Sequence, residues 1–516
     1  MKNNNLNIKI IENNEFFLKY WKYLLIGIFS LGLAIRLIFL PVNVPLTLDA
    51  TSYLWYALDT KTLGYFPVDH GFPNAGWPQW LSLIFFVIPS SEILDYMSVQ
   101  RISSVIISSL TIFPVFFLCK KYFRNSISLV GALFFSIEPH LILNSHLGIT
   151  EPLFILFIVT SIVCVLSENK KLAYLGFVLS ALATLVRYEG LLFLSVLSIM
   201  FFISYKTDSK KIIKYGLALS IFILVLLPFT YIQTQEDGLT NNVAAGIITP
   251  LKLTENEENQ TVSLLIFVFD GFQNLVKYTG WVMIPYFIIL TPIGIIICFK
   301  NKNQNKSIFI ISIIVLSIPA LYAYSRGIQE TRYLLILIPF FTIFSLFFIE
   351  KIIRKENGKF IVIGIMILVI ISSVLYVDYK KIDALHEKES YLISKQVGKL
   401  ALNVNEFYPE SKFLKIAYVE EYDFPIIGND IPIIHPIETQ EYDSIFEFIK
   451  QNQKNNLTHL VIDNNVDRKQ FLKEVFNNEM KYPFLTKVFD SKDLEFDYLV
   501  KIFEIDYNKF SKYISE

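Results

Sequence analysis

Long apolar runs separated by short polar breaks fill the sequence up to about residue 378. A helix needs about 20 largely apolar residues to cross the hydrocarbon core of a bilayer. We therefore predict a polytopic α-helical membrane domain over residues 1–378, with about eleven transmembrane helices. Their approximate cores are 21–40, 99–118, 127–144, 151–166, 172–186, 190–205, 213–232, 281–299, 307–323, 333–349 and 359–377.

The pattern changes in residues 379–516, where hydrophobicity falls and charges of both signs appear. Short β-type runs alternate with helical segments such as RKQFLKEVFNN, which predicts a small soluble α/β domain. No Gly-rich phosphate loop, nucleophile elbow or paired metal motif occurs in this sequence, so we do not expect catalysis there. The β-type runs are KIAYVE, THLVID, TKVFD and YLVKIFEI.

Lysine and arginine are distributed unequally between alternate connections. One set of connections holds twenty of these residues, whereas the other set, although its loops are longer, holds six. Because cytoplasmic loops carry the excess of positive charge, the N-terminus is predicted to be cytoplasmic. With an odd number of spans, the C-terminal domain is then predicted to be extracytoplasmic, with the protein in the cell (plasma) membrane.

Two of the predicted outward connections are long. Residues 41–98 contain WPQWLSLIFFVI, which is too short and too interrupted by proline to span, so we expect a helix at the membrane surface. Residues 233–280 contain the polar run LTENEENQT followed by SLLIFVF, which we also expect at the surface.

Composition agrees with a membrane protein. The 516 residues are 53% hydrophobic and 18% charged, with a mean hydropathy of +0.48. The net charge is zero, and no basic stripe is interleaved with aromatic residues, so a nucleic-acid partner is not expected. Three cysteines, all placed toward the cytoplasm by the predicted topology, imply no disulfide framework.

Asp49 is the first candidate for chemistry, because it lies about nine residues after the first predicted span and on the outward side. An acid so close to the membrane surface can meet a substrate whose head group projects from the lipid. Asp is also a common N-cap residue, so Asp49 could equally cap a helix that begins at Ala50. The spacing alone leaves both readings open.

The segment from Asp49 through Tyr53, Ala57 and Gly64 to the aromatic, Pro-rich stretch ending at Trp80 resembles the first external loop of GT-C glycosyltransferases. The similarity is to the protein mannosyltransferase and aminoarabinose transferase group, and it extends over roughly residues 20–350. Three further segments are similar to the same group: SIEPHLILNSHLGITEPLFILF, TLVRYEGLLF and ETRYLLILIPFF.

The resemblance implies a sugar transferred from a polyprenyl (dolichyl-type) phosphate to a protein, lipid or glycan acceptor at the outer face of the membrane. It also implies that Asp49 is the general base, which takes the proton of a poorly nucleophilic acceptor as the sugar moves. Direct displacement with inversion would follow, without a covalent glycosyl-enzyme. Ala50 stands where the family often has a second acid, which puts a paired-acid or metal role at this position in doubt.

A second group of candidates comprises Glu138, His140, His146 and Glu151, which flank the outward turn between the third and fourth predicted spans. Acids in a membrane domain are costly and therefore candidates for function. A divalent metal bound by Glu138, His140 and Glu151 is one hypothesis for a cofactor; substrate binding by these residues is another. Alternatively, Glu138 and His140 flank a kink at Pro139 and hydrogen-bond internally.

Few cations are available on the outward side for a phosphate, which arginine binds well through its planar fork. Arg332 with Tyr333 matches the family's position for the donor phosphate, and Arg187 with Glu189 is the other candidate. Snorkelling or a simple Arg187–Glu189 pair would explain these residues without a substrate. Tyr53 and His70 complete the candidate substrate-binding residues, although His70 precedes a glycine and is also typical of a turn.

Other functions are weighed against this hypothesis. An oligosaccharyltransferase catalytic subunit shares the fold but is expected to carry a WWDYG motif, which this sequence lacks. A transporter or flippase of lipid-linked glycans would tend to show internal repeats, and we find no convincing repeat. A noncatalytic receptor that displays the outer domain would not need Asp49.

Overall fold

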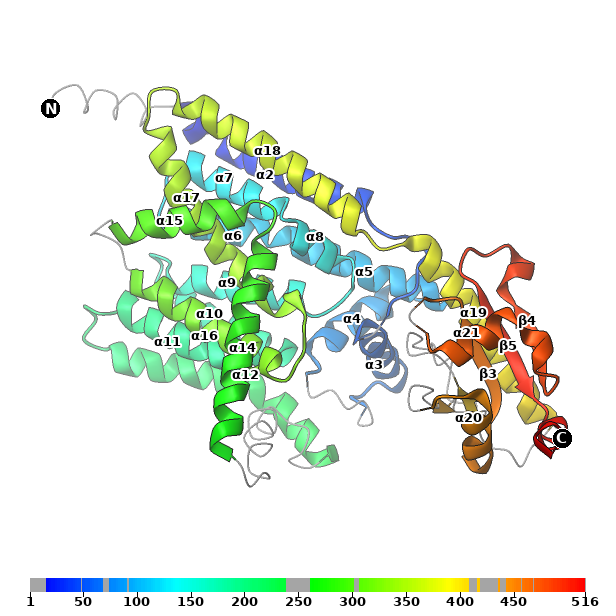
Figure 1. Cartoon of the computed structure of the whole chain (residues 1–516). Coiled ribbons are helices and arrows are strands. Elements are labelled where there is room, and N and C mark those ends of the chain that lie inside the picture. Colours follow the sequence, from blue (N-terminus) through cyan, green and yellow to red (C-terminus); the bar gives the residue numbers. More distant parts are fainter. Residues whose placement is uncertain are drawn as a thin grey trace. The chain divides into compact units, whose positions relative to one another are not determined.

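The computed structural model divides the chain into two compact units, one of residues 1–40 and 49–381 and the other of residues 41–48 and 382–516 (Figure 1). We describe each unit by itself. The residues that the structure describes are 15–47, 49–67, 74–90, 92–237, 260–300, 306–407, 415–417, 435–436, 442–455, 457–466 and 468–515.

The first unit is built from helices. In its first half these are α2 (Glu15–Ile38), α3 (Asp49–Leu63), α4 (Gly76–Val87), α5 (Ile93–Leu110), α6 (Ile112–Lys120), α7 (Asn125–Ser136), α8 (Pro139–Ser145), α9 (Glu151–Val165) and α10 (Leu172–Val186). The second half comprises α11 (Glu189–Ser204), α12 (Lys211–Asp237), α14 (Gln260–Met283), α15 (Phe287–Lys300), α16 (Lys306–Ser325), the 3-10 helix η2 (Thr331–Leu337), α17 (Ile338–Ile353) and α18 (Gly358–Lys380).

Each of the eleven segments predicted to span the membrane falls on a helix or on a pair of helices. Five stretches in the described residues are long and apolar enough to cross a membrane, or seven if each of two bent pairs counts as one span. Four shorter apolar helices accompany them. The prediction of a helical protein with several apolar spans is confirmed at this level.

Two of the predicted spans are not straight helices. α7 and α8 meet at an angle of 50°, because Pro139 begins α8 and cannot continue the hydrogen bonding of α7. α14 and α15 are bent by 108°, and α14 begins at Gln260, within residues that we predicted to be a surface loop. The run SLLIFVF in this connection is therefore helical, and its position at the membrane surface stays a prediction.

The connection after α2 contains the two helices α3 and α4. The expected helix over WPQWLSLIFFVI is present as α4, which buries Trp77, Leu81 and Phe85 on one side. Leu83 and Phe86 are exposed on the other side. A helix that is apolar on its protein-facing and exposed sides suits a membrane interface, and that location remains a prediction.

Close backbone contact fixes some of the helix packing in the first unit. α15 packs on α17, and a Cβ atom built at Gly294 would overlap the carbonyl oxygen of Phe344. α9 likewise packs on α10, and α14 on α16. Small residues at helix contacts allow such close approach, and dispersion then stabilises the pair.

The second unit contains a five-stranded mixed sheet in the order β2-β1-β3-β5-β4. β1 is parallel to β2 and β3, whereas β5 is antiparallel to β3 and β4. All four β-type runs predicted from the sequence contain a strand. The elements of this unit are α19 (Ala384–Phe407), β1 (Lys415–Ala417), β2 (His435–Pro436), α20 (Ile445–Asn452), β3 (Leu457–Asp463), α21 (Gln470–Asn477), β4 (Leu485–Asp490), β5 (Val500–Ile505) and α22 (Tyr507–Ser515).

Both faces of this sheet are covered. Leu460 and Ile462 of β3 belong to a core cluster that includes residues of α20 and α21. Val461, which points to the other face, packs in a second cluster with Ile393 and Val397 of α19. Alternate residues of a strand face opposite sides, so burial of consecutive residues in β3 places this strand in the centre of the unit.

Candidate functional site

Asp49 is the first residue of α3, and its carboxylate pairs with an arginine that is 283 positions away in the sequence. Nη1 of Arg332 donates to Oδ2 of Asp49 over 2.6 Å. The Nε side of the same guanidinium forms an ion pair with Glu330. The arginine proposed for a phosphate thus contacts the carboxylate proposed as a base.

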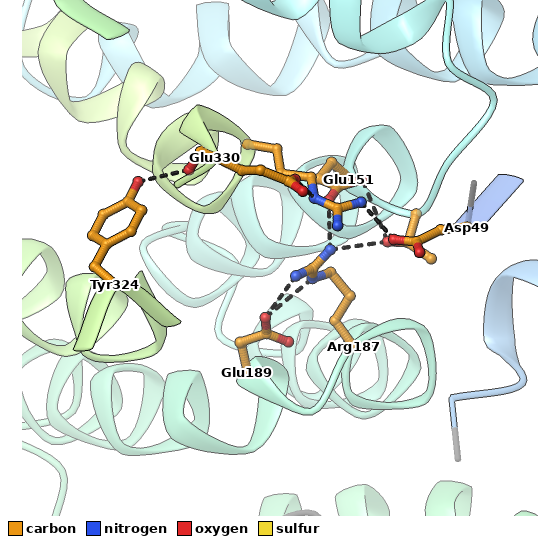
Figure 2. Close-up of polar contacts among 8 residues, drawn as sticks. Asp49, Glu151, Arg187, Glu189, Tyr324 and Glu330 are labelled. Carbon is orange, nitrogen blue, oxygen red and sulfur yellow. Dashed lines mark hydrogen bonds and ion pairs between the residues drawn. The ribbon is translucent and has the colours of Figure 1, made fainter. Parts of the chain in front are cut away.

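A second guanidinium, that of Arg187, bridges two carboxylates in the same cluster (Figure 2). Its Nη1 donates to Oε1 of Glu151 at 2.6 Å and to Oγ1 of Thr150 at 3.1 Å. Its Nη2 and Nε donate to Oε1 of Glu189 at 2.8 and 3.2 Å. The Arg187–Glu189 pair expected from the sequence therefore exists, but as one half of a bridge that also holds Glu151.

The cluster forms where helix ends meet. Asp49, Glu151 and Glu189 lie in the first turns of α3, α9 and α11 respectively. The N-terminus of a helix carries a partial positive charge, which stabilises an acid at each of these positions. Arg187 ends α10, and Arg332 lies at the start of η2. The acidic and the basic side chains of the cluster therefore all lie at helix ends.

Tyr333 lies near both guanidinium groups. Its ring centroid is 5.7 Å from Cζ of Arg187 and 5.6 Å from Cζ of Arg332, distances typical of cation–π contacts. The hydroxyl of Tyr324, labelled in Figure 2, donates to the backbone oxygen of Glu330 at 2.8 Å. The aromatic residues thus hold Arg332 and the segment before it in position.

A small pocket adjoins this cluster. Both arginines, Glu151 and Glu189 contribute its charged part. The remainder of its wall is aromatic or apolar, so the pocket places charged groups of both signs beside a surface that suits hydrocarbon. Those lining residues are Phe154, Ile155, Leu316, Pro319, Tyr333 and Ile336.

Tyr53 stands within electrostatic range of the cluster. Burial, followed by the negative charge of Glu151, raises the pKa of the Tyr53 phenol, so this group stays protonated at neutral pH. It can therefore serve as a hydrogen-bond donor. His70, the other candidate from the first connection, lies outside the described residues.

Glu138 and His140 are engaged in a different network. Glu138 is fully buried and caps α8, since its Oε2 accepts from the backbone N–H of Leu141 at 2.7 Å. Its Oε1 lies 3.0 Å from Nδ1 of His140, and Nε2 of that histidine is 3.1 Å from the hydroxyl of Tyr376. These contacts are the internal hydrogen bonds that the kink at Pro139 suggested as an alternative.

At the helix break near residue 137, backbone carbonyl groups accept hydrogen bonds from side chains of α2, of α18 and of the turn between α14 and α15. Arg36 of α2 donates from Nη1 to the carbonyl of Ser136 at 2.6 Å, and Tyr286 donates to that of Phe134 at 2.7 Å. Ser373 of α18 donates to the carbonyl of Ile137. Free carbonyls at the end of α7 would otherwise be costly in an apolar environment, so this network stabilises the bent pair.

The described part of the chain contains no cluster of side chains that supports the metal hypothesis. No group of three or more His, Cys, Asp or Glu side chains there is placed to hold a metal ion. Glu151 pairs with Arg187, whereas Glu138 and His140 bond to each other. The three residues therefore do not form one metal site, because the helix break and the Arg187 bridge direct them to different partners.

Sequence reasoning missed Glu330 and Thr150 as members of the cluster. Glu330 is the first residue of ETRYLLILIPFF, so an acid two positions before Arg332 was a visible signal. Thr150 directly precedes Glu151 and had no distinguishing feature in the sequence. Its role follows only from the approach of Arg187.

Comparison with known proteins agrees with this architecture. Residues 87–236 match the family model described as dolichyl-phosphate-mannose-protein mannosyltransferase. No match is found among curated protein sequences.

Three solved structures show similarity of fold. The Archaeoglobus fulgidus oligosaccharyltransferase in complex with Zn and sulfate has a TM-score of 0.55 at 11% identity, covering 85% of this chain and 68% of its own. AglB from the same organism, in complex with an inhibitory peptide and a dolichol-phosphate, gives 0.53 at 12%, covering 86% and 70%. ArnT from Cupriavidus metallidurans bound to undecaprenyl phosphate gives 0.53 at 8%, covering 93% and 97%.

These findings define the class of fold: the chain has the architecture of the GT-C membrane glycosyltransferases, to which its sequence is also similar. The resemblance stated from the sequence is thereby confirmed.

Proposed function

We propose that the protein transfers a sugar from a polyprenyl (dolichyl-type) phosphate to an acceptor at the outer face of the membrane, with Asp49 as the general base. The observation that carries this proposal is the 2.6 Å contact between Asp49 and Arg332 at the edge of a pocket that Arg332 also lines. A base and a phosphate-binding cation are both needed for this reaction, and here they are adjacent.

The pocket supports a lipid-linked phosphate as the donor. A polyprenyl phosphate has an anionic head on a long hydrocarbon chain. Arg332 supplies charge-assisted donors for the head, with Arg187 as a second cation nearby. Leu316, Pro319 and Ile336 supply an apolar wall for the first part of the chain. A soluble nucleotide-sugar donor would gain nothing from that wall.

One general base is sufficient for the proposed reaction. The acceptor heteroatom forms a bond to the anomeric carbon, its proton passes to the Asp49 carboxylate, and the bond between that carbon and the phosphate oxygen breaks. The electron pair stays on the leaving polyprenyl phosphate, whose increased charge a neighbouring guanidinium stabilises. Direct displacement of this kind inverts the configuration at the anomeric carbon.

The proposed topology has eleven spans, a cytoplasmic N-terminus and the C-terminal unit outside, in the plasma membrane. It is supported by the excess of lysine and arginine in alternate connections. This arrangement would expose Asp49 on the outer side, where lipid-linked sugars and acceptors meet.

An oligosaccharyltransferase-type reaction is the second candidate, favoured by the similarity of fold to the Archaeoglobus fulgidus enzyme. Against it stands the absence of a WWDYG motif from the sequence. The donor distinguishes the two reactions: the leading proposal expects a single sugar on a monophosphate, and the second expects an oligosaccharide. A flippase, in contrast, would move the lipid without breaking the sugar–phosphate bond.

The test supplies the purified protein in lipid nanodiscs with a panel of radiolabelled polyprenyl-phosphate monosaccharides and with lipid-linked oligosaccharides. Release of free polyprenyl phosphate with transfer of label is expected for a monosaccharide donor. Asp49→Asn is expected to lower the rate by about 10²–10⁴, the usual contribution of a general base, with an unchanged melting temperature.

Asp59→Asn, which makes the same change of charge further along α3, is the matched control and is expected to retain activity. Turnover by Asp49→Asn at the wild-type rate would contradict the role of Asp49. Transfer only from lipid-linked oligosaccharides would favour the second candidate.

A further inference from the structure

Arg332 is the residue that links the pocket to the base. It lines the pocket together with Arg187, whereas Asp49 is not among the described side chains that line it. Because Asp49 binds the same guanidinium through Nη1, an anion that enters the pocket and the Asp49 carboxylate compete for Arg332. An acidic residue that contacts neither Arg187 nor Arg332 would not compete with the anion in this way.

The two arginines differ in how easily their partners can be exchanged. The side chains of Arg187 and its partners Glu151 and Glu189 are 15%, 5% and 20% exposed. Those of Arg332 and its partners Asp49 and Glu330 are 23%, 40% and 45% exposed. Solvent-exposed ion pairs contribute only about 0–1 kcal/mol, whereas breaking a buried pair leaves an uncompensated charge. The Arg332–Asp49 pair is therefore the one that exchanges at low cost.

We infer that Arg332 switches between two anions: it neutralises Asp49 when the donor site is empty, and it turns to the phosphate of the donor when the lipid binds, which releases Asp49 to act as the base. This inference rests on the proposed function. Arg187 keeps its two carboxylates throughout and remains the fixed cation of the site. Activation of the acceptor then follows binding of the donor.

The switch has a consequence for binding that is separate from catalysis. If Asp49 and the phosphate compete for Arg332, loss of the Asp49 charge must strengthen binding of the lipid phosphate. If Asp49 acts only on the acceptor, its replacement by asparagine leaves that binding unchanged. Competition further requires that the gain disappear when Arg332 is absent.

The experiment is a double-mutant cycle on the binding of undecaprenyl phosphate, without sugar, to the full-length protein in nanodiscs. Asp49→Asn is expected to bind about three- to fivefold more tightly than wild type, as release of an exposed ion pair allows. Arg332→Gln is expected to bind at least tenfold more weakly. The double variant is expected to bind like Arg332→Gln alone.

Two outcomes would overturn the switch while leaving the proposed function intact: unchanged binding in Asp49→Asn, or a gain of the same size in the presence and absence of Arg332, which would indicate a general effect of charge. Asp59→Asn serves as the charge control and is expected to bind like wild type. Failure of the wild-type protein to bind undecaprenyl phosphate or dolichyl phosphate would instead contradict the proposed donor. Thermal melting of each variant confirms that it is folded.

Discussion

Arg187 holds Glu151 at 2.6 Å and Glu189 at 2.8 Å, and so ties the start of α9 to the start of α11. Glu151 is nearly fully buried, at 5% side-chain exposure. A buried carboxylate that loses its cationic partner is strongly destabilising. This bridge therefore serves both the stability of the first unit and the shape of the pocket.

Arg187→Met is expected to lower the free energy of unfolding by about 3–5 kcal/mol, because it leaves the Glu151 charge buried and unpaired. Thermal or chemical unfolding of the purified protein measures the loss. Adding Glu151→Gln to this variant removes the uncompensated charge and is expected to restore most of the stability.

Sugar transfer is not expected to return with stability in that double variant, because the guanidinium that faces the pocket is still absent. If full activity returned, Arg187 would be a structural residue only. If Arg187→Met and the double variant with Glu151→Gln were equally unstable, the unpaired Glu151 charge would not be the cause of the instability.

Gly294→Ala is expected to destabilise the protein by about 1–3 kcal/mol, the usual cost of overpacking. The added Cβ meets the backbone carbonyl of Phe344, so α15 must move away from α17. The melting temperature in detergent measures the effect. Gly364→Ala is the control, since a Cβ there meets nothing within 4 Å, and it is expected to leave stability unchanged or slightly raised because alanine favours a helix.

Met480→Cys is expected to react with a membrane-impermeant thiol reagent on intact cells, because the residue is 94% exposed and the C-terminal unit is proposed to lie outside. The native Cys119, Cys164 and Cys298 are buried and give little background. Lys206→Cys, at a position predicted to be cytoplasmic, is expected to react only after permeabilisation. The opposite pattern would reverse the proposed orientation.

The second unit is expected to lose stability as the pH falls from about 6.5 to about 4. Burial lowers the pKa of His459 on β3 to about 4, so the unfolded chain binds a proton in this range that the folded chain does not. Stability is complete above the unfolded pKa of about 6.5, and the loss reaches at most about 3 kcal/mol near pH 4.

Urea titration followed by a short proteolysis pulse, with detection of a C-terminal tag on the full-length protein, measures this dependence. His459→Gln removes the titrating group and is expected to flatten the profile between pH 6.5 and 4. If the stability of His459→Gln fell with pH as steeply as that of the wild type, groups other than His459 would cause the pH dependence. The carboxyl groups of Asp490 and Asp506 have lowered pKa values and titrate below this range.

The sequence determined most of the secondary structure. Apolar runs long enough to cross a membrane became helices, and the runs THLVID, TKVFD and YLVKIFEI became strands β3, β4 and β5. Such patterns are readable because burial of an apolar face depends on the residues of one segment. The sequence also indicated Asp49, Arg187 and Arg332 as candidates, and the resemblance to known glycosyltransferases implied a role for Asp49 and for Arg332.

Only the tertiary structure decided which of these residues meet. Asp49 pairs with Arg332 across 283 positions, and Arg187 binds both Glu151 and Glu189 where one partner was expected. The break of α7 at residue 137 directs Glu138 and His140 to each other and away from Glu151. An ion pair depends on which helix ends lie together and on how deeply they are buried, and neither property is carried by the local pattern of a single segment.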